Sequence, residues 1–282
     1  MESTDSLPIE DTFADIISKA QAGHHISLTE LSERSGVSTQ QIQALKSGVL
    51  DEQVLVAVAP HLHLHTSSLL KIAANQYAPN ARAARNVRRF ATPFAMATGE
   101  RLTVNAYLYF DRHSKDAIVV DTGTDAEKLF AFIRSEALNV RGILLTHTHL
   151  DHISVLESLR ELDTHPNVYV SAQEPVEGAE WFTPEATLHL GSLVVVARET
   201  SGHTAGGSSF ILKEGGAEPV AFVGDALFAG SVGGAPGRMS GALHLIRQHI
   251  LSLPADTLVC PGHGPLTTVG YERSHNPFLA SH

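Results

Sequence analysis

Thr146-His147-Thr148-His149-Leu150-Asp151-His152 is the most informative stretch of this sequence. It places three imidazoles and one carboxylate directly after the apolar run Gly142-Ile143-Leu144-Leu145 and before a helical pattern. Neutral imidazole and carboxylate are the usual ligands of zinc and of borderline metals such as iron and manganese. Two His at i and i+2 can face one ion, and the Asp and His that follow can turn toward a neighbouring one. The stretch therefore indicates the beginning of two metal sites.

Three more candidate ligands follow, each beside glycine at the end of a predicted strand. They are His203 in Gly202-His203-Thr204, Asp225 in Gly224-Asp225-Ala226 and His263 in Gly262-His263-Gly264. Glycine lets the backbone turn sharply and leaves room for an ion. A chance accumulation of His on a surface loop is the alternative, since the chain has 17 His, but it does not explain the downstream set.

Strands and helices alternate from about residue 90, which indicates a layered α/β architecture. Thr124 and Glu127 predict a capping box at the start of one helix, and another helix is expected over about 241–253. The predicted strands are 102–110, 117–120, 142–145, 167–171, 188–190, 194–199, 208–212, 220–223 and 257–260.

The first 80 residues have a different character. Residues 1 to about 12 suggest a mobile acidic tail, and a helical pattern begins at Phe13. Ser27 with Glu30 forms a capping box, Gly36 marks a turn, and Ser38 caps a second short helix. The segment 27–48 resembles a helix-turn-helix of the lambda-repressor-like kind.

Charge argues against DNA as the partner of this helical domain. Residues 1–80 hold four basic and nine acidic residues, a net charge of −5, whereas a DNA-binding module must neutralise phosphates. Packing or homo-oligomer formation is the preferred role. Residues 81–89, which include Arg82, Arg85, Arg88 and Arg89, form a basic linker, and 90–282 form the second domain.

The whole chain has 282 residues, a formal net charge of −10 and 43% hydrophobic residues. The single Cys260 cannot form an internal disulfide, which fits a reducing compartment. No apolar run reaches the roughly 18 residues of a membrane span. We expect a cytoplasmic protein without a membrane partner.

The ordered set His-x-His-x-Asp-His, then His, Asp and His, resembles the metallo-β-lactamase superfamily. The resemblance covers roughly 90–282 and implies an αββα sandwich, here preceded by a small all-α domain. It implies two divalent ions, with zinc preferred and iron or manganese as alternatives. The ligands that it implies are His147, His149 and His203 for the first ion, Asp151, His152 and His263 for the second, and Asp225 as the bridge. Asp121, in Asp121-Thr122-Gly123, is the candidate that orients a ligand loop by hydrogen bonds, although it could equally cap the following turn.

Within the superfamily, Gly224 to Ser231 and Pro261 to Thr268 are similar to short-form type II glyoxalases, the hydroxyacylglutathione hydrolases. Glu272-Arg273 and Asn276-Pro277-Phe278 extend this similarity. It implies a small-molecule substrate, an acyl thioester of the S-lactoylglutathione type, cleaved by a hydroxide between the two metals. Asp151 is the catalytic candidate, because it could accept a hydrogen bond from this nucleophile.

Two departures concern the substrate. Only 19 residues follow His263, so the helical C-terminal domain that binds glutathione in long-form relatives is not expected. Gly233 to Met239 stand where relatives often carry Gly-Arg-x-Asp. No substrate-binding residue is therefore assigned.

Three other functions remain open. A persulfide dioxygenase would hold one iron with residues matching His147, His203 and Asp225, and the retained second set favours two metals instead. A lactonase acting on acyl-homoserine lactones shares the ligand set. A DNA-binding regulator with a metal-sensing domain is the non-enzymatic alternative. Class B β-lactamases commonly carry Cys where this chain has Asp225, which counts against β-lactam hydrolysis.

Overall fold

The computed structural model describes residues 7–79, 81, 83–95, 101–213 and 219–280. Residues 1–6 of the expected tail, and Arg82 of the expected linker, lie outside the described residues. Within the described part, no helix is both long and apolar enough to cross a membrane.

The first part of the chain is helical, as its capping residues predict. Ser27 and Glu30 form the expected capping box, Gly36 ends the helix in the left-handed region at φ 70°, and Ser38 caps the next helix. The helices are α1 (Phe13–Gly23), α2 (Leu28–Ser35), α3 (Thr39–Lys46), α4 (Glu52–Val58), the short 3-10 helix η1 (Ala59–Leu62) and α5 (Thr66–Ala73).

The described end of the expected tail makes specific contacts with the rest of the chain. Thr12 caps α1 in a capping box with Asp15. Asp11 is only 7% exposed and lies against the β-rich part of the chain. The Asp11 carboxylate therefore serves a buried contact rather than solvation.

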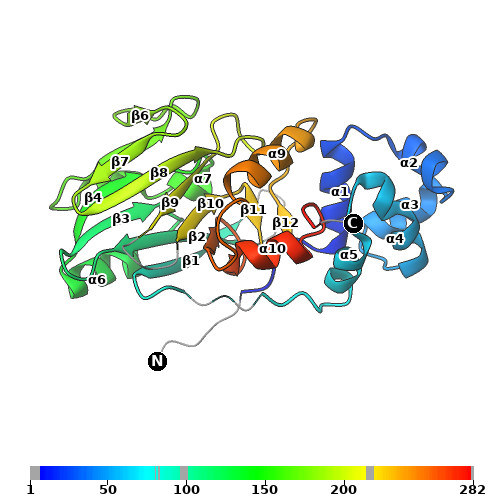
Figure 1. Cartoon of the computed structure of the whole chain (residues 1–282), viewed down its shortest axis with the longest axis horizontal. Coiled ribbons are helices and arrows are strands. Elements are labelled where there is room, and N and C mark those ends of the chain that lie inside the picture. The colour runs from blue at the N-terminus through cyan, green and yellow to red at the C-terminus, as the bar shows by residue number, and fades with distance from the viewer. Residues whose placement is uncertain (1–6, 80, 82, 96–100, 214–218, 281–282) are drawn as a thin grey trace.

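Two six-stranded sheets follow the helical segment (Figure 1). The first has the order β1-β2-β3-β4-β5-β6, antiparallel from β1 to β3 and parallel from β3 to β6. Its strands are β1 (Val87–Ala95), β2 (Arg101–Phe110), β3 (Asp116–Val120), β4 (Asn139–Leu144), β5 (Asn167–Ser171) and β6 (Glu180–Phe182).

The second sheet has the order β14-β13-β10-β9-β8-β7, in which only β10 and β13 run parallel. A separate two-stranded hairpin, β11 (Leu227–Phe228) with β12 (Ser231–Val232), follows β10. The strands of the second sheet are β7 (Thr187–Leu190), β8 (Leu193–Glu199), β9 (Ser208–Leu212), β10 (Val220–Gly224), β13 (Leu258–Pro261) and β14 (Thr267–Thr268).

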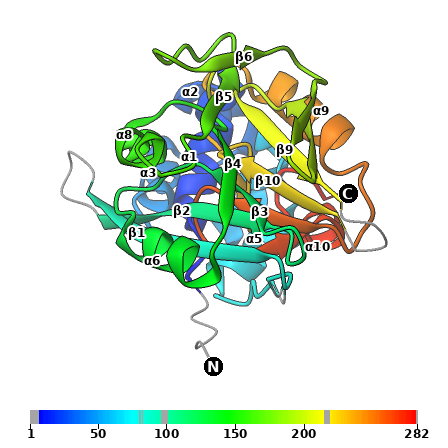
Figure 2. The same cartoon turned by 90° about the vertical axis from the view of Figure 1, so that its left-hand side faces the viewer.

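The sheets pack face to face over an apolar layer that contains Tyr107, Phe210 and Phe222. Helices α6 (Glu127–Glu136) and α8 (Leu156–Arg160) cover the outer face of the first sheet (Figure 2). Helices α9 (Met239–His249) and α10 (Val269–His275) cover the outer face of the second. The result is the αββα sandwich with preceding helices that the sequence predicts.

The capping box predicted at Thr124 and Glu127 does not form. Helix α6 begins after Ala126 without a side-chain cap, and Glu127 N–H donates to Asp125 Oδ1 instead. The Thr124 hydroxyl donates to the carbonyl of Pro93, on the neighbouring β1. The Thr124 hydroxyl therefore makes a tertiary hydrogen bond instead of the helix cap that the sequence predicted.

The N-terminal helices share an apolar core with the second part of the chain. Their buried residues, among them Ile16, Leu55 and Leu69, belong to one apolar cluster with Val223 of β10 and Met239 of α9. In Figure 1 the helices α9 and α10 lie between the sheets and α1 to α5. The helical segment thus adds a further layer over the outer face of the second sheet.

Candidate metal centre

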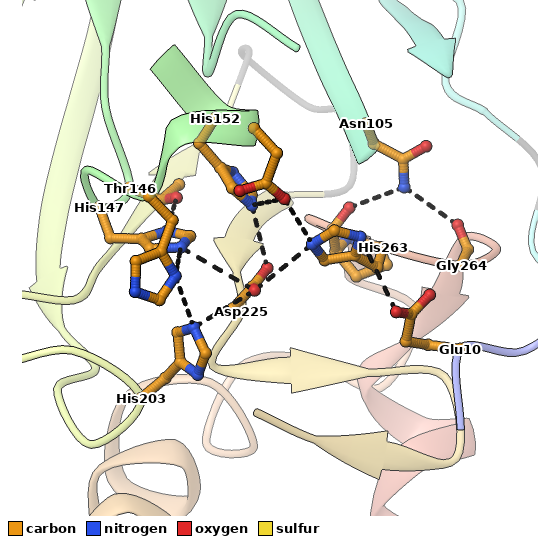
Figure 3. A network of polar contacts seen from close by, with 12 residues as sticks. Glu10, Asn105, Thr146, His147, His152, His203, Asp225, His263 and Gly264 are labelled. Carbon is orange, nitrogen blue, oxygen red and sulfur yellow. Dashed lines mark hydrogen bonds and ion pairs between the residues drawn. The ribbon is translucent and has the colours of Figure 1, made fainter. Parts of the chain in front are cut away.

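Every candidate ligand follows the carboxyl end of a strand or lies in a loop at the same edge of the sandwich. His147 and His149 follow β4, and Asp151 and His152 lie in the short helix α7 (Leu150–Ile153) directly after them. His203 lies in the loop between β8 and β9, Asp225 follows β10, and His263 follows β13. The strands thus bring together residues that are more than 100 positions apart (Figure 3).

The first cluster consists of His147, His149, His203 and Asp225, with one ligand atom of each within 4.8 Å of the others. Nδ1 of His149 lies 3.2 Å from Nε2 of His147 and 3.0 Å from Nε2 of His203. Ring nitrogens that face one another so closely need a proton or a cation between them.

The second cluster consists of Asp151, His152 and His263, which are all buried. Asp151 Oδ2 lies 3.3 Å from Nε2 of His263 and 3.7 Å from Nε2 of His152.

Asp225 lies between the two clusters. Its Oδ1 is 3.4 Å from His152 Nε2, and its Oδ2 is 3.5 Å from both His203 Nε2 and His263 Nε2. Since this carboxylate lies near imidazoles of both clusters, Asp225 has the position that a bridging ligand requires.

Asp121 sets the protonation of two of these imidazoles. Its carboxylate accepts hydrogen bonds from the Thr146 backbone N–H and hydroxyl and from His152 Nδ1, each at 2.8 Å. The Thr146 hydroxyl, having donated its hydrogen, accepts from His147 Nδ1 at 3.0 Å. Because both rings donate through Nδ1, both leave Nε2 as the nitrogen with a lone pair.

Backbone carbonyls do the same for two more of the five imidazoles. His203 Nδ1 donates to Gly234 O at 3.1 Å, and His263 Nδ1 donates to Thr103 O at 2.9 Å. A carbonyl can only accept, so these rings too present Nε2 to the centre.

The carboxylates of the centre favour positive charge beside them. Burial lowers the pKa of His152, but Asp225 and Asp121 outweigh burial and raise it to about 10. The same balance, with Asp225 and Asp151, raises the pKa of His263 to about 11. Burial alone raises the pKa of Asp225, yet the imidazoles of His263 and His152 hold it well below its usual range.

Among the buried side-chain atoms without a hydrogen bond in the described residues, two belong to the centre, His152 Nε2 and Asp225 Oδ1, which lie 3.4 Å from one another. Burying polar groups without hydrogen bonds is costly. A donor set of imidazole nitrogens and carboxylate oxygens with orphaned atoms fits divalent metal ions, and the residues present therefore suit the cofactor that the sequence predicts.

Two supporting residues escape sequence analysis. Asn105, in β2, donates through Nδ2 to Pro261 O and Gly264 O, each at 3.0 Å, and so holds the loop of His263. Glu174 is 7% exposed and accepts from the Thr148 hydroxyl at 2.6 Å and from Gly206 N–H at 3.0 Å. It thereby joins the loop of His149 to the loop of His203. Neither residue belongs to a motif, and only the tertiary structure reveals them.

A family model described as the metallo-beta-lactamase superfamily matches residues 99–263, the part that contains both clusters. The chain belongs to the metallo-beta-lactamase superfamily. Membership agrees with the sandwich and with the position of the clusters at its edge.

Three proteins illustrate what the chain is similar to. A probable metallo-hydrolase of Streptococcus pyogenes is 32% identical over 61% of this chain and 84% of its own length. The hydroxyacylglutathione hydrolase GloC of Haemophilus influenzae is 31% identical over 63% of this chain and 93% of its own. The crystal structure of the BLEG-1 B3 metallo-beta-lactamase is 31% identical, with a TM-score of 0.57 over 69% of this chain and all of that one. The chain is accordingly a metallo-hydrolase of this superfamily.

Proposed function

We propose that this metallo-hydrolase cleaves acyl thioesters of the hydroxyacylglutathione type. The observation that carries the proposal is the pair of ligand clusters with Asp225 between them, at 3.4 to 3.5 Å from imidazoles of both. The sequence motifs around Asp225 and His263 and the name of the Haemophilus relative support this substrate class.

Two divalent cations, when bound, supply Lewis acidity and bring the pKa of water toward neutrality. Zinc is the preferred identity, with iron and manganese as alternatives, because the imidazole and carboxylate donor set suits all three. His147, His149 and His203 would hold the first cation, and Asp151, His152 and His263 the second.

Asp151 is the proposed proton acceptor. Burial raises its pKa, but the hydrogen bond with His263 and the positive charge of His152 outweigh burial, so the pKa lies below its usual value. The carboxylate is therefore ionised at neutral pH and able to accept a hydrogen bond from water. This orients the water oxygen toward the acyl carbon.

Hydrolysis of a thioester makes modest demands on the remaining residues. One proton of the water passes to the Asp151 carboxylate as the water oxygen forms a bond to the acyl carbon. The C–S bond then breaks, and the sulfur leaves with the electron pair as a thiolate. A thiol has a pKa of about 8.5, so the leaving sulfur needs no proton at the moment of cleavage. An acid next to the leaving group is thus not required.

The test is thiol release from S-lactoylglutathione by the full chain loaded with zinc, iron or manganese, followed with a colorimetric thiol reagent. The wild-type protein should release thiol, and Asp225→Ala should lower kcat/KM by more than about 100-fold, because it removes the carboxylate between the clusters. A fully metal-loaded protein that releases no thiol from a panel of acyl thioesters would refute the proposal.

β-Lactam hydrolysis is the second candidate, because BLEG-1 matches at 31% identity over its whole chain. A β-lactam and an acyl-homoserine lactone therefore belong in the same panel. Oxygen uptake with glutathione persulfide tests the dioxygenase alternative. If the kcat/KM for one of these substrates exceeds that for thioesters, the protein is assigned the corresponding activity instead of thioester hydrolysis.

A further inference from the structure

Two residues of the helical segment contact the hairpin that follows Asp225. Lys19, on α1, donates to the backbone carbonyl of Val232 at 3.2 Å and to the carboxylate of Asp11. The Ser231 hydroxyl donates to the same Asp11 oxygen. The segment before the sandwich is therefore tied to β12 by polar groups as well as by apolar packing.

These contacts are shielded from water. Asp11 and Ser231 are 7% and 1% exposed, and the Lys19 ammonium lies 5.1 Å from the centre of the Phe228 ring. A buried carboxylate that loses its cationic partner is strongly destabilised. Asp11, Lys19 and Ser231 therefore act as one unit that fixes the hairpin.

The hairpin in turn determines where two candidate ligands lie. The chain leaves Asp225, passes through β11 and β12, and returns at Gly233 so closely that a Cβ there would lie 1.9 Å from the Asp225 carbonyl oxygen. The next residue, Gly234, accepts the hydrogen bond from His203 Nδ1. A shift of the hairpin would therefore move the Asp225 backbone and turn the His203 ring.

The same segment also reaches the second cluster. Glu10 Oε1 lies 3.9 Å from His263 Nδ1, and the Glu10 backbone nitrogen would lie 3.3 Å from a Cβ at Gly264 (Figure 3). Residues 8–19 consequently contact the loops of both Asp225 and His263.

We propose that Asp11 and Lys19 are positioning residues of the metal centre, which act through the β11–β12 hairpin on Asp225 and His203. The helical segment is then a structural part of the centre and not an independent binding module. This inference rests on the metal centre of the proposed function but not on the identity of the substrate.

The experiment compares Lys19→Met with Lys71→Met in the full chain. Lys71, on α5, is exposed and supplies a control with the same change of charge and shape. Zinc affinity is measured by competition with a chromogenic chelator, the visible spectrum of the cobalt-loaded protein reports ligand geometry, and thermal unfolding reports stability. Ser231→Ala, which deletes one buried donor, is measured in the same way.

Lys19→Met should weaken zinc binding by at least about tenfold and alter the cobalt spectrum, whereas Lys71→Met should match the wild type. Lys19→Arg should weaken zinc binding less than Lys19→Met does, because the arginine side chain keeps the positive charge. A Lys19→Met protein that melts earlier but keeps the wild-type zinc affinity and cobalt spectrum would overturn the proposal.

If Lys19→Met does not fold, Ser231→Ala decides by the same criterion. Zinc affinity and the cobalt spectrum need no substrate, so a wild-type protein without thioesterase activity refutes the proposed function and leaves this comparison intact.

Discussion

Asp121 accepts a hydrogen bond from Thr146 through each carboxylate oxygen, and through one of them also from His152, so that a single side chain orients a ring in each ligand cluster. It adopts φ 53°, in the left-handed region. Asparagine tolerates this region as well as aspartate does. Asp121→Asn therefore changes the hydrogen-bonding chemistry without adding backbone strain.

We expect Asp121→Asn to weaken metal binding by about 10- to 100-fold, because its amide N–H groups oppose the N–H and O–H donors that now face the carboxylate. Chelator competition with zinc measures the change. Asp163→Asn, an exposed change of the same kind, should have no effect. Equal affinities for Asp121→Asn and wild type would show that Asp121 only shapes its turn.

Glu174→Gln should weaken the first metal site more than the second. The amide has one acceptor oxygen in place of two, so one of the charge-assisted hydrogen bonds from the Thr148 hydroxyl and the Gly206 N–H is lost, and the connection between the loops of His149 and His203 weakens. We expect about a tenfold loss of zinc affinity in one of two binding steps, measured by titration calorimetry. The nearby exposed Glu177→Gln is the matched control. An equal loss in both steps would contradict this role.

Zinc binding to chelator-treated protein at pH 8 should release at least two protons, since the pKa values of His152 and His263 are raised to about 10 and 11 and both ligands must lose a proton. Calorimetry in buffers of different ionisation enthalpy measures this number. Uptake of protons, or no release, would contradict the charge balance described above.

The same shifts fix the sign of the pH dependence without metal. Raised pKa values mean that the folded chain holds these protons more tightly than the unfolded chain. The stabilisation is complete below pH of about 6.5 and is lost as pH rises through about 10 and 11. Unfolding of the chelated protein by urea across this range should show a falling free energy of unfolding.

Glu272→Ala should destabilise the fold by roughly 3 kcal/mol or more, because it leaves buried donors without an acceptor. Glu272 is fully buried. It accepts hydrogen bonds from Tyr77, Thr267, Gly230 and Asn276. Chemical denaturation measures the change, and the exposed Glu33→Ala should stay within about 0.5 kcal/mol of wild type. A similar small effect at position 272 would mean that water replaces the lost acceptor.

The helical segment should not retain duplex DNA. Helix α3 is the segment that the helix-turn-helix resemblance would make a recognition helix. Its basic residue is Lys46, and this ammonium donates to Gln21 of α1. A mobility shift assay at low salt should therefore show no complex. A shift that weakens steeply as salt rises would restore the regulator hypothesis.

The local sequence pattern was sufficient to predict several strands and the position of the metal-ligand motif. The predicted strands 167–171 and 208–212 coincide with β5 and β9. The motif from His147 to His152 lies directly after β4, because an apolar run buried on both faces must end where its polar residues begin. The superfamily and the sandwich could thus be inferred from the sequence.

Features that depend on contacts between residues far apart in the chain could not be predicted from the sequence. Thr124 caps no helix because Pro93 accepts its hydroxyl, and Asn105 supports His263 from 158 positions away in the chain. Residues 7–12 have the composition of a solvated tail, yet Asp11 meets its partners in Lys19 and Ser231. A polar residue whose partners are remote in the chain gives no periodic signal. The residues next to it in the sequence therefore cannot identify its role.

The apolar cluster that unites Ile16 and Leu69 with Val223 and Met239 also determines how the molecule melts. If the N-terminal helices unfold, the apolar residues that they cover on the sandwich become exposed to water. The helices and the sandwich should therefore unfold together. Heating should accordingly produce one calorimetric transition, with the helices and the sheets disappearing together.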